Sequence, residues 1–154
     1  MTISNPAPAA HSNPLLECFP FVLLALTLWR EARGCSYAEK VAIANVIFNR
    51  TTDRLNRWPK TLAAAICQPA QFTSIAPPPH ITPMEMANAT TWPKDGDVQF
   101  AECCRIAEEF ALHPVPDDTC GATHYYSEPI ASPPPWANPE RMTLHLGVFR
   151  FYRL

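Results

Sequence analysis

The sequence predicts a mostly helical α+β domain that carries a small antiparallel β-sheet near its C-terminus. Apolar residues recur at helical spacing in several stretches before residue 112. After residue 121 the segments are short and rich in β-branched and aromatic residues, which favours strands. The 18 prolines against 4 glycines indicate rigid, turned connections between these elements. We expect residues 1–14 to be a flexible lead-in and residues 15–154 to form a single domain.

The first predicted helix, residues 23–33, carries an acid in an unusual place. The helix is an apolar run that ends at Gly34, whose permissive backbone suits a C-cap. Glu31 follows Leu24 by seven positions and Leu28 by three, so its side chain shares their core-facing side. A capping role, an internal ion pair with an arginine, or exposure at a frayed helix end would each explain such an acid. Partial burial would instead raise its pKa and keep a proton available for general-acid chemistry near neutral pH.

Further helices and strands follow from capping signals and periodicity. Ser36 and Thr82 each begin a capping box, in which a hydroxyl and a carboxylate satisfy the first amides of a helix. On the last predicted helix, Glu102, Glu108 and Glu109 fall largely opposite the apolar face, and we expect them to be solvated. The expected helices span about residues 37–49, 61–67, 83–91 and 97–111, and the expected strands lie within residues 122–126, 143–146 and 148–152.

Composition excludes several classes of partner and site. The formal net charge of −2 argues against a nucleic-acid surface or an anionic membrane as partner. The apolar run 21–29 is much shorter than the roughly 20 residues that a membrane span requires. No lysine or arginine precedes Arg30, so we expect no secretory signal. The six cysteines form no C-x-x-C pair, and no zinc-site spacing appears, so we expect reduced, mostly buried thiols with no metal or cofactor.

Blocks along the chain resemble, in the same order, those of the spore cortex-lytic type of cell wall hydrolase. The resemblance covers residues 23–153 and begins with residues 25–34, followed by residues 41–50. The later matching blocks are Trp58-Pro59-Lys60-Thr61, Gln68-Pro69-Ala70-Gln71-Phe72-Thr73, Gly121-Ala122-Thr123-His124-Tyr125, Pro135-Trp136-Ala137 and Gly147-Val148-Phe149-Arg150-Phe151-Tyr152.

This resemblance implies a lysozyme-like domain that cleaves the glycan strands of peptidoglycan, with Glu31 as the general acid. Family members of the spore type are lytic transglycosylases, whose chemistry can proceed with one carboxyl group. After Glu31 protonates the oxygen between N-acetylmuramic acid and N-acetylglucosamine, its carboxylate can take the proton of the muramoyl C6 hydroxyl, which gives a 1,6-anhydro sugar. The family commonly has a second acid just after Gly34, where this chain has Cys35, and this departure favours the one-acid route. A muramidase that hydrolyses the same bond with a second carboxylate is the alternative.

The resemblance also implies substrate-binding residues. Gln71, His124 and Tyr125 match positions that would face the cleft, where hydrogen-bonding groups can orient glycan hydroxyls and acetamido groups. Phe72 and Trp136 are loop aromatics that are candidates for a wall and a lid of the same cleft. The alternative for Phe72, Tyr125 and Trp136 is that they pack in the core. For His124 the alternative is a purely structural role.

Other functions stay open at the level of sequence. A thiol peptidase of the cell wall would pair a cysteine such as Cys120 with His124 or His145, and a wall-binding module would keep the fold without the chemistry. A zinc amidase is disfavoured because no H-E-x-x-H or comparable spacing occurs. With no signal and no separate wall-binding segment, we expect a monomeric lysin, such as a phage endolysin, made in the cytoplasm and released to the wall by another factor.

Overall fold

The computed structural model describes residues 14–154, with side chains from residue 19 onward. The predicted lead-in therefore lies outside the described residues, except for Pro14, which begins the first helix. A mostly helical α+β arrangement with a small sheet near the C-terminus confirms the predicted fold class. The elements in chain order are α1 (Pro14–Ala32), α2 (Tyr37–Thr51), α3 (Leu62–Ile66), α4 (Pro83–Thr90), α5 (Val98–Leu112), β1 (His124–Ser127), the 3₁₀ turn η1 (Pro139–Arg141), β2 (Met142–Leu146) and β3 (Phe149–Tyr152).

The first helix is longer than the sequence predicted. It begins at Pro14 and continues through Pro20, whereas the apolar run alone predicted a start near residue 23. An internal proline removes one backbone donor and costs about 3 kcal/mol, which is why it reads as a boundary in the sequence. Leu24 and Leu28 farther along are fully buried, and such burial of the apolar face is what stabilises most helices in proteins. Among the described residues, no helix is both long enough and apolar enough to cross a membrane.

The remaining helices begin where the capping signals predicted. Ser36 and Thr82 accept the amides of Glu39 and Glu85, and each glutamate bonds back to the amide of its cap, so both capping boxes are confirmed. Asp97 caps α5 by accepting two backbone amides.

Two expectations about charged and sulfur-containing side chains need correction. Glu102 is only 24% exposed, because it forms an ion pair with the fully buried Lys40 of α2; Glu108 and Glu109 are exposed as predicted. The thiols are free in the five cysteines whose side chains are described, but Cys103 alone among them is buried. The prediction of mostly buried thiols is therefore wrong, because most of these cysteines lie on outward faces of helices or in loops.

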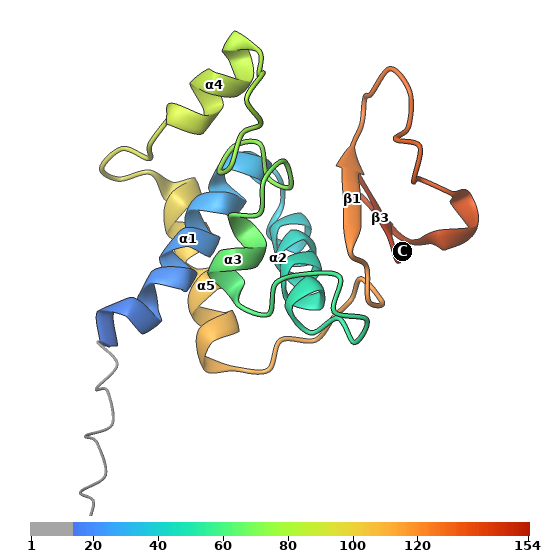
Figure 1. The fold of residues 1–154 in the computed structure, drawn as a ribbon. Coiled ribbons are helices and arrows are strands. Elements are labelled where there is room, and N and C mark those ends of the chain that lie inside the picture. Colours follow the sequence, from blue (N-terminus) through green and yellow to red (C-terminus); the bar gives the residue numbers. More distant parts are fainter. Residues whose placement is uncertain (1–13) are drawn as a thin grey trace, which may run out of the picture.

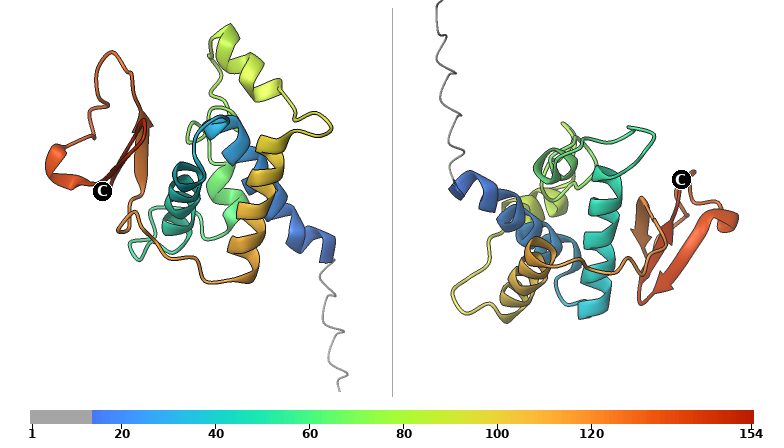
Figure 2. Two further views of the ribbon diagram at one scale, coloured as in Figure 1. Left: turned by 180° about the vertical axis from the view of Figure 1, so that it is seen from behind. Right: turned by 90° about the horizontal axis from the view of Figure 1, so that it is seen from below.

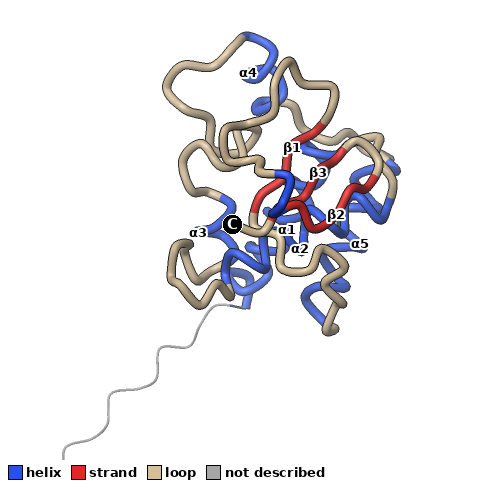
Figure 3. Tube along the Cα trace, turned by 90° about the vertical axis from the view of Figure 1, so that its right-hand side faces the viewer, coloured by secondary structure: helices blue, strands red, loops and turns tan. Residues whose placement is uncertain are grey.

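The sheet has the order β1-β3-β2 with both pairs antiparallel. Alternation along the strands gives it two aromatic faces. Tyr125, Phe149 and Phe151 pack toward the hydrophobic core, whereas His124 and Tyr152 lie on the outer face. Figure 3 looks onto that outer face, with α1, α2 and α5 behind the strands.

The arrangement of the helices places the end of α1 between the sheet and α4. Helix α1 packs against α5 and α3, and α2 lies between this group and the sheet (Figures 1 and 2). Helix α4 projects away from the other helices and has no buried residue (Figure 1). The C-terminal turn of α1 therefore faces a region bounded by elements that are distant in the sequence.

Candidate active site

Glu31 lies in the last turn of α1 and is held by two hydroxyl groups. Its Oε1 accepts a hydrogen bond from Ser74 Oγ at 2.5 Å, and its Oε2 accepts one from Tyr125 OH at 3.2 Å. Among the described residues no lysine or arginine forms an ion pair with it. Neither a cap nor an ion pair therefore explains this acid.

The surroundings of Glu31 favour its protonated form. Burial raises the pKa of the Glu31 carboxyl, and the hydrogen bonds from Ser74 and Tyr125 oppose this shift without cancelling it. The negative end of the helix dipole acts in the same direction as burial, because α1 ends at the next residue. A carboxyl group with these properties can deliver a proton at a pH where an ordinary glutamate is ionised.

Ser74 belongs to a loop that Arg30 fixes in place. The Arg30 guanidinium is buried and donates from one nitrogen to the Ser74 carbonyl at 2.8 Å and from two others to the Thr91 carbonyl at 3.1 and 2.9 Å. Phe72, which is 1% exposed, anchors the same loop in the core. The sequence did not single out Ser74, although it directly follows a block that matched the family; a serine in a polar loop gives no signal of its own.

Tyr125 reaches Glu31 from the inner face of the sheet. Its ring packs between Phe149 and Phe151, with centroid distances of 5.7 and 5.9 Å. Burial raises the pKa of the Tyr125 hydroxyl well above its usual range, so the group stays a hydrogen-bond donor. The resemblance placed Tyr125 at the cleft as a sugar ligand, whereas in the structure its hydroxyl bonds to the acid itself.

A cavity of about 520 Å³ opens beside the acid. Its walls are formed by Arg30, Glu31 and Arg33 at the end of α1 and by α4 with the residue after it. Glu85 is the second carboxylate in this lining; its Oε2 accepts the Thr82 amide and hydroxyl, and these bonds lower the pKa of the Glu85 carboxyl. The cavity thus joins a carboxyl with a raised pKa to a carboxylate that is readily ionised. The lining comprises Arg30, Glu31, Arg33, Met84, Glu85, Ala87, Asn88 and Thr91.

The other predicted site residues lie elsewhere. His124 is half-buried on the outer face of β1, where its ring packs against Trp58 and Trp136 at centroid distances of 5.5 and 5.1 Å. Burial, reinforced by nearby arginines, lowers the pKa of His124 to about 4, so the ring is neutral near pH 7. Neither His124 nor Trp136 lines the cavity of Glu31.

The loop residues predicted as ligand contacts also differ in placement. Phe72 packs in the core with the Arg50 guanidinium 5.3 Å from its ring, so its side chain has no surface for a sugar. Its predicted place in a ligand wall is therefore corrected: a phenyl ring beside a polar loop gains more from burial than from exposure. Gln71 is half-buried next to it and does not line the cavity of Glu31.

Comparison with known proteins assigns the chain to a family. The model of the cell wall hydrolase family matches residues 34–152. The chain belongs to the cell wall hydrolase family. This membership confirms the predicted class of enzyme. Glu31 lies three residues before the matched range, so its role is argued from the geometry above.

Solved structures show the same fold. The catalytic domain of the Bacillus cereus SleB protein superimposes with a TM-score of 0.57 and 22% identity, over 87% of this chain and 89% of that one. The catalytic domain of the germination-specific lytic transglycosylase SleB from Bacillus anthracis has a TM-score of 0.58 and 22% identity, over 96% of this chain and 100% of that one. No curated protein matches the chain.

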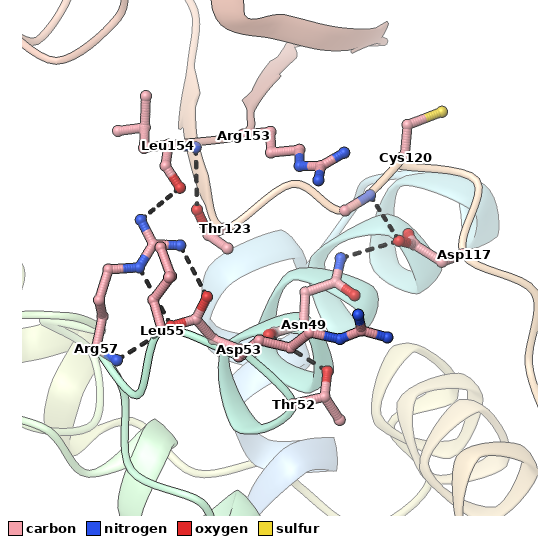
Figure 4. Close-up of a pocket in the computed structure, with 12 residues that line it drawn as sticks. Asn49, Thr52, Asp53, Leu55, Arg57, Asp117, Cys120, Thr123, Arg153 and Leu154 are labelled. Carbon is pink, nitrogen blue, oxygen red and sulfur yellow. Dashed lines mark hydrogen bonds and ion pairs between the residues drawn. The ribbon is translucent and has the colours of Figure 1, made fainter.

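The thiol alternative finds no support in this cell wall hydrolase. Cys120 is exposed at the rim of a separate cavity of about 720 Å³ between the end of α2 and the start of β1 (Figure 4). Cys120 and His124 share no hydrogen bond, and Nδ1 of His124 instead contacts Thr123 Oγ1 at 3.0 Å. For His145, the other candidate base, the one side-chain hydrogen bond among the described residues joins Nε2 to the carbonyl oxygen of Gly147 at 3.2 Å.

The carboxylates in that larger cavity are occupied by structural roles. Asp53 pairs with Arg57 at 2.8 Å, and its pKa is lowered to about 2 by these bonds. Asp117 accepts bonds from Asn49 and from the amide of Gly121 (Figure 4). This larger cavity therefore holds no carboxyl whose pKa is raised like that of Glu31.

Proposed function

We propose that this protein cleaves the bond between N-acetylmuramic acid and N-acetylglucosamine in peptidoglycan, as a lytic transglycosylase with Glu31 as both acid and base. The observation that carries the proposal is the Glu31 carboxyl, which lies in a cavity wall, is held by two hydroxyls and has a raised pKa. Family membership and the fold shared with a lytic transglycosylase support it.

The reaction needs one proton that leaves Glu31 and returns to it. The carboxyl protonates the glycosidic oxygen while the bond from this oxygen to C1 of the muramoyl sugar breaks. The cationic sugar is then attacked at C1 by its own C6 oxygen, and Glu31 takes the C6 hydroxyl proton. The product has a 1,6-anhydro end, no water is consumed, and the acid is regenerated.

Ser74 and Tyr125 have a defined part in this cycle. Between the two proton transfers Glu31 is a carboxylate in a partly buried place, which is unfavourable without donors. The two hydroxyls donate to separate oxygens of that carboxylate and so stabilise the state that must act as the base.

Hydrolysis of the same bond is the second candidate, and Glu85 is the observation that favours it. A muramidase needs a second carboxylate to activate water or to act as nucleophile. Glu85 lines the cavity of Glu31, and its lowered pKa keeps it ionised. The two routes differ in their dependence on Glu85 and in their products.

Digestion of purified peptidoglycan with three proteins tests both routes. Wild type, Glu31→Gln and Glu85→Gln are compared, and the released sugar ends are identified by mass spectrometry. The proposal expects anhydro-muramoyl ends, a loss of at least about 100-fold in rate for Glu31→Gln, and nearly full activity for Glu85→Gln, because glutamine still caps α4. Reducing ends together with an inactive Glu85→Gln would establish hydrolysis, and release of peptide from intact glycan would overturn both.

We also propose that the protein acts as an endolysin that reaches the wall only after release from the cell that makes it. The test is expression in a bacterial host with and without a membrane-permeabilising partner. Lysis only in the presence of that partner is expected, and lysis without it would contradict the proposed release.

A further inference from the structure

A second cavity adjoins the one beside Glu31. It measures about 340 Å³ and shares Arg33 and Thr91 with the cavity of the acid. Trp29 and Trp92 contribute its aromatic lining. A linear ligand that passes Glu31 can therefore continue across Arg33 and Thr91 into this second hollow.

Trp92 presents a fixed and open aromatic surface in that hollow. The ring is 67% exposed, and the Arg30 guanidinium lies 5.0 Å from its centroid. Arg30 is itself held by the carbonyls of Ser74 and Thr91, so it supports the indole from one side. Two thirds of the Trp92 surface is exposed, and this exposed part is available to a ligand. Aromatic faces of this kind stack on the apolar C–H faces of sugar rings.

Arg33 supplies a hydrogen-bond donor beside this surface. Its guanidinium lies 4.4 Å from the centroid of the Trp29 ring, and Trp29 Nε1 is anchored to Asp97 Oδ2 at 3.0 Å. Arg33 is exposed and forms no ion pair with any carboxylate in the part of the chain that the structure describes. Its N–H groups can thus donate to the acetamido carbonyl of a sugar that rests on Trp92.

We propose that Trp92 and Arg33 form an additional sugar-binding subsite, which holds an N-acetylated sugar of the glycan strand beyond the sugars at Glu31. The inference rests on the proposed function for its ligand, the glycan strand. It follows that the enzyme prefers long strands, because short oligosaccharides fill only the cavity of the acid.

Binding measured without cleavage tests the subsite. In a Glu31→Gln background, calorimetry compares Trp92→Ala, Trp92→Phe, Arg33→Gln and a control, Phe19→Ala, which removes another exposed aromatic ring at 57% exposure. The probes are peptide-free glycan strands of six or more sugars, a disaccharide, and free stem peptides. Circular dichroism verifies that each variant is folded.

The subsite predicts a loss that depends on ligand length. Trp92→Ala should weaken binding of long strands roughly 10-fold, Arg33→Gln by a smaller factor, and Trp92→Phe little, with disaccharide binding unchanged. Equal affinity of Trp92→Ala and the parent for long strands would overturn the subsite, as would an equal loss in Phe19→Ala. A loss confined to stem peptides would replace the sugar with a peptide ligand. Since no cleavage is needed, an unexpected product in the digestion experiment would refute the proposed reaction and leave this binding result valid.

Discussion

At the scale of single residues, two hydroxyl groups set the balance between the acid and base forms of Glu31. Burial favours the protonated form, and donation from Ser74 and Tyr125 favours the carboxylate. In the proposed reaction Glu31 both gives and takes a proton within one cycle, and such a group needs both influences.

Removal of one hydroxyl should shift this balance in a known direction. In Tyr125→Phe the carboxylate loses a donor at 3.2 Å, so the pKa of Glu31 rises further. We expect a rate of glycan cleavage about 10-fold lower, since a hydrogen bond to a charged group contributes about 1.5 kcal/mol. The alkaline limb of the pH profile should move to higher pH. Tyr126→Phe, which alters the outer-face neighbour on the same strand, is the control, and an equal effect there would contradict the assignment.

His124 makes a prediction about stability and pH. Its folded-state pKa of about 4 lies below the unfolded value near 6.5, so the unfolded state binds more protons between these values. The neutral ring therefore contributes stability above pH 6.5 that is lost as the pH falls toward 4. After a discount for partial exposure we expect this loss to be about 2 kcal/mol. Urea unfolding of wild type and His124→Phe at several pH values measures it, and parallel curves for the two proteins would refute it.

At the scale of elements, a buried ion pair joins α2 to α5. Lys40 is fully buried, and its Nζ contacts Glu102 Oε1 at 2.5 Å and Gln99 Oε1 at 2.7 Å. An uncompensated buried charge is costly, so Glu102→Gln should lower the free energy of unfolding by about 3 kcal/mol. The double variant Lys40→Met/Glu102→Gln should recover part of this loss. If chemical denaturation shows no recovery of the free energy of unfolding in the double variant, then lost packing and not an unpaired buried charge causes the destabilisation by Glu102→Gln.

A second contact between elements fixes the sheet to α2. Glu39, which caps α2, also accepts the Val148 amide of the β2–β3 turn at 3.2 Å. Gly147 has a φ of +55°, and a Cβ there would lie 1.9 Å from Glu39 Oε1. Gly147→Ala should therefore displace the cap and lower the free energy of unfolding by about 2–4 kcal/mol. Unfolding measurements on Gly147→Ala, with the exposed Gly96→Ala as a positive-φ control in open space, separate the collision from backbone strain.

At the scale of the whole molecule, the cavity beside Glu31 has one rigid wall and one exposed wall. The rigid side is the C-terminal end of α1, a helix that packs in the core. Helix α4, in contrast, has no buried residue and is attached by contacts such as that from Asn88 Nδ2 to the Arg30 carbonyl at 3.3 Å. Elements with few buried contacts open locally at low free energy.

Amide hydrogen exchange should show this difference. Backbone amides of α4 should exchange at least about 100-fold faster than those of the buried face of α2. Glycan strands bound to Glu31→Gln should slow exchange in α4, because this helix forms a wall of the cavity. Exchange in α4 that is as slow as in α2 would show that this wall is not mobile. Exchange in α4 that does not change when glycan binds would show that the helix does not contact the ligand.

The sequence by itself determined the helices and strands, the helix caps, and the position of Glu31 on the inner face of its helix. These features depend on periodicity and on hydrogen bonds between residues three or four apart, so they can be read locally. The ordered blocks also indicated the family, which the comparison confirmed. The start of α1 was missed because its internal proline resembles a boundary.

Only the tertiary structure decided which groups surround the acid. Ser74 and Tyr125 lie 43 and 94 residues from Glu31, and the same packing that brought them there buried Phe72 and turned His124 to the opposite face of the sheet. Residue type and local pattern do not encode such distances, since these arise when the whole chain folds so as to minimise the apolar surface that is exposed to water. Glu31 is thus recognisable in the sequence as an acid in an apolar stripe, but its partners and its raised pKa are properties of the fold.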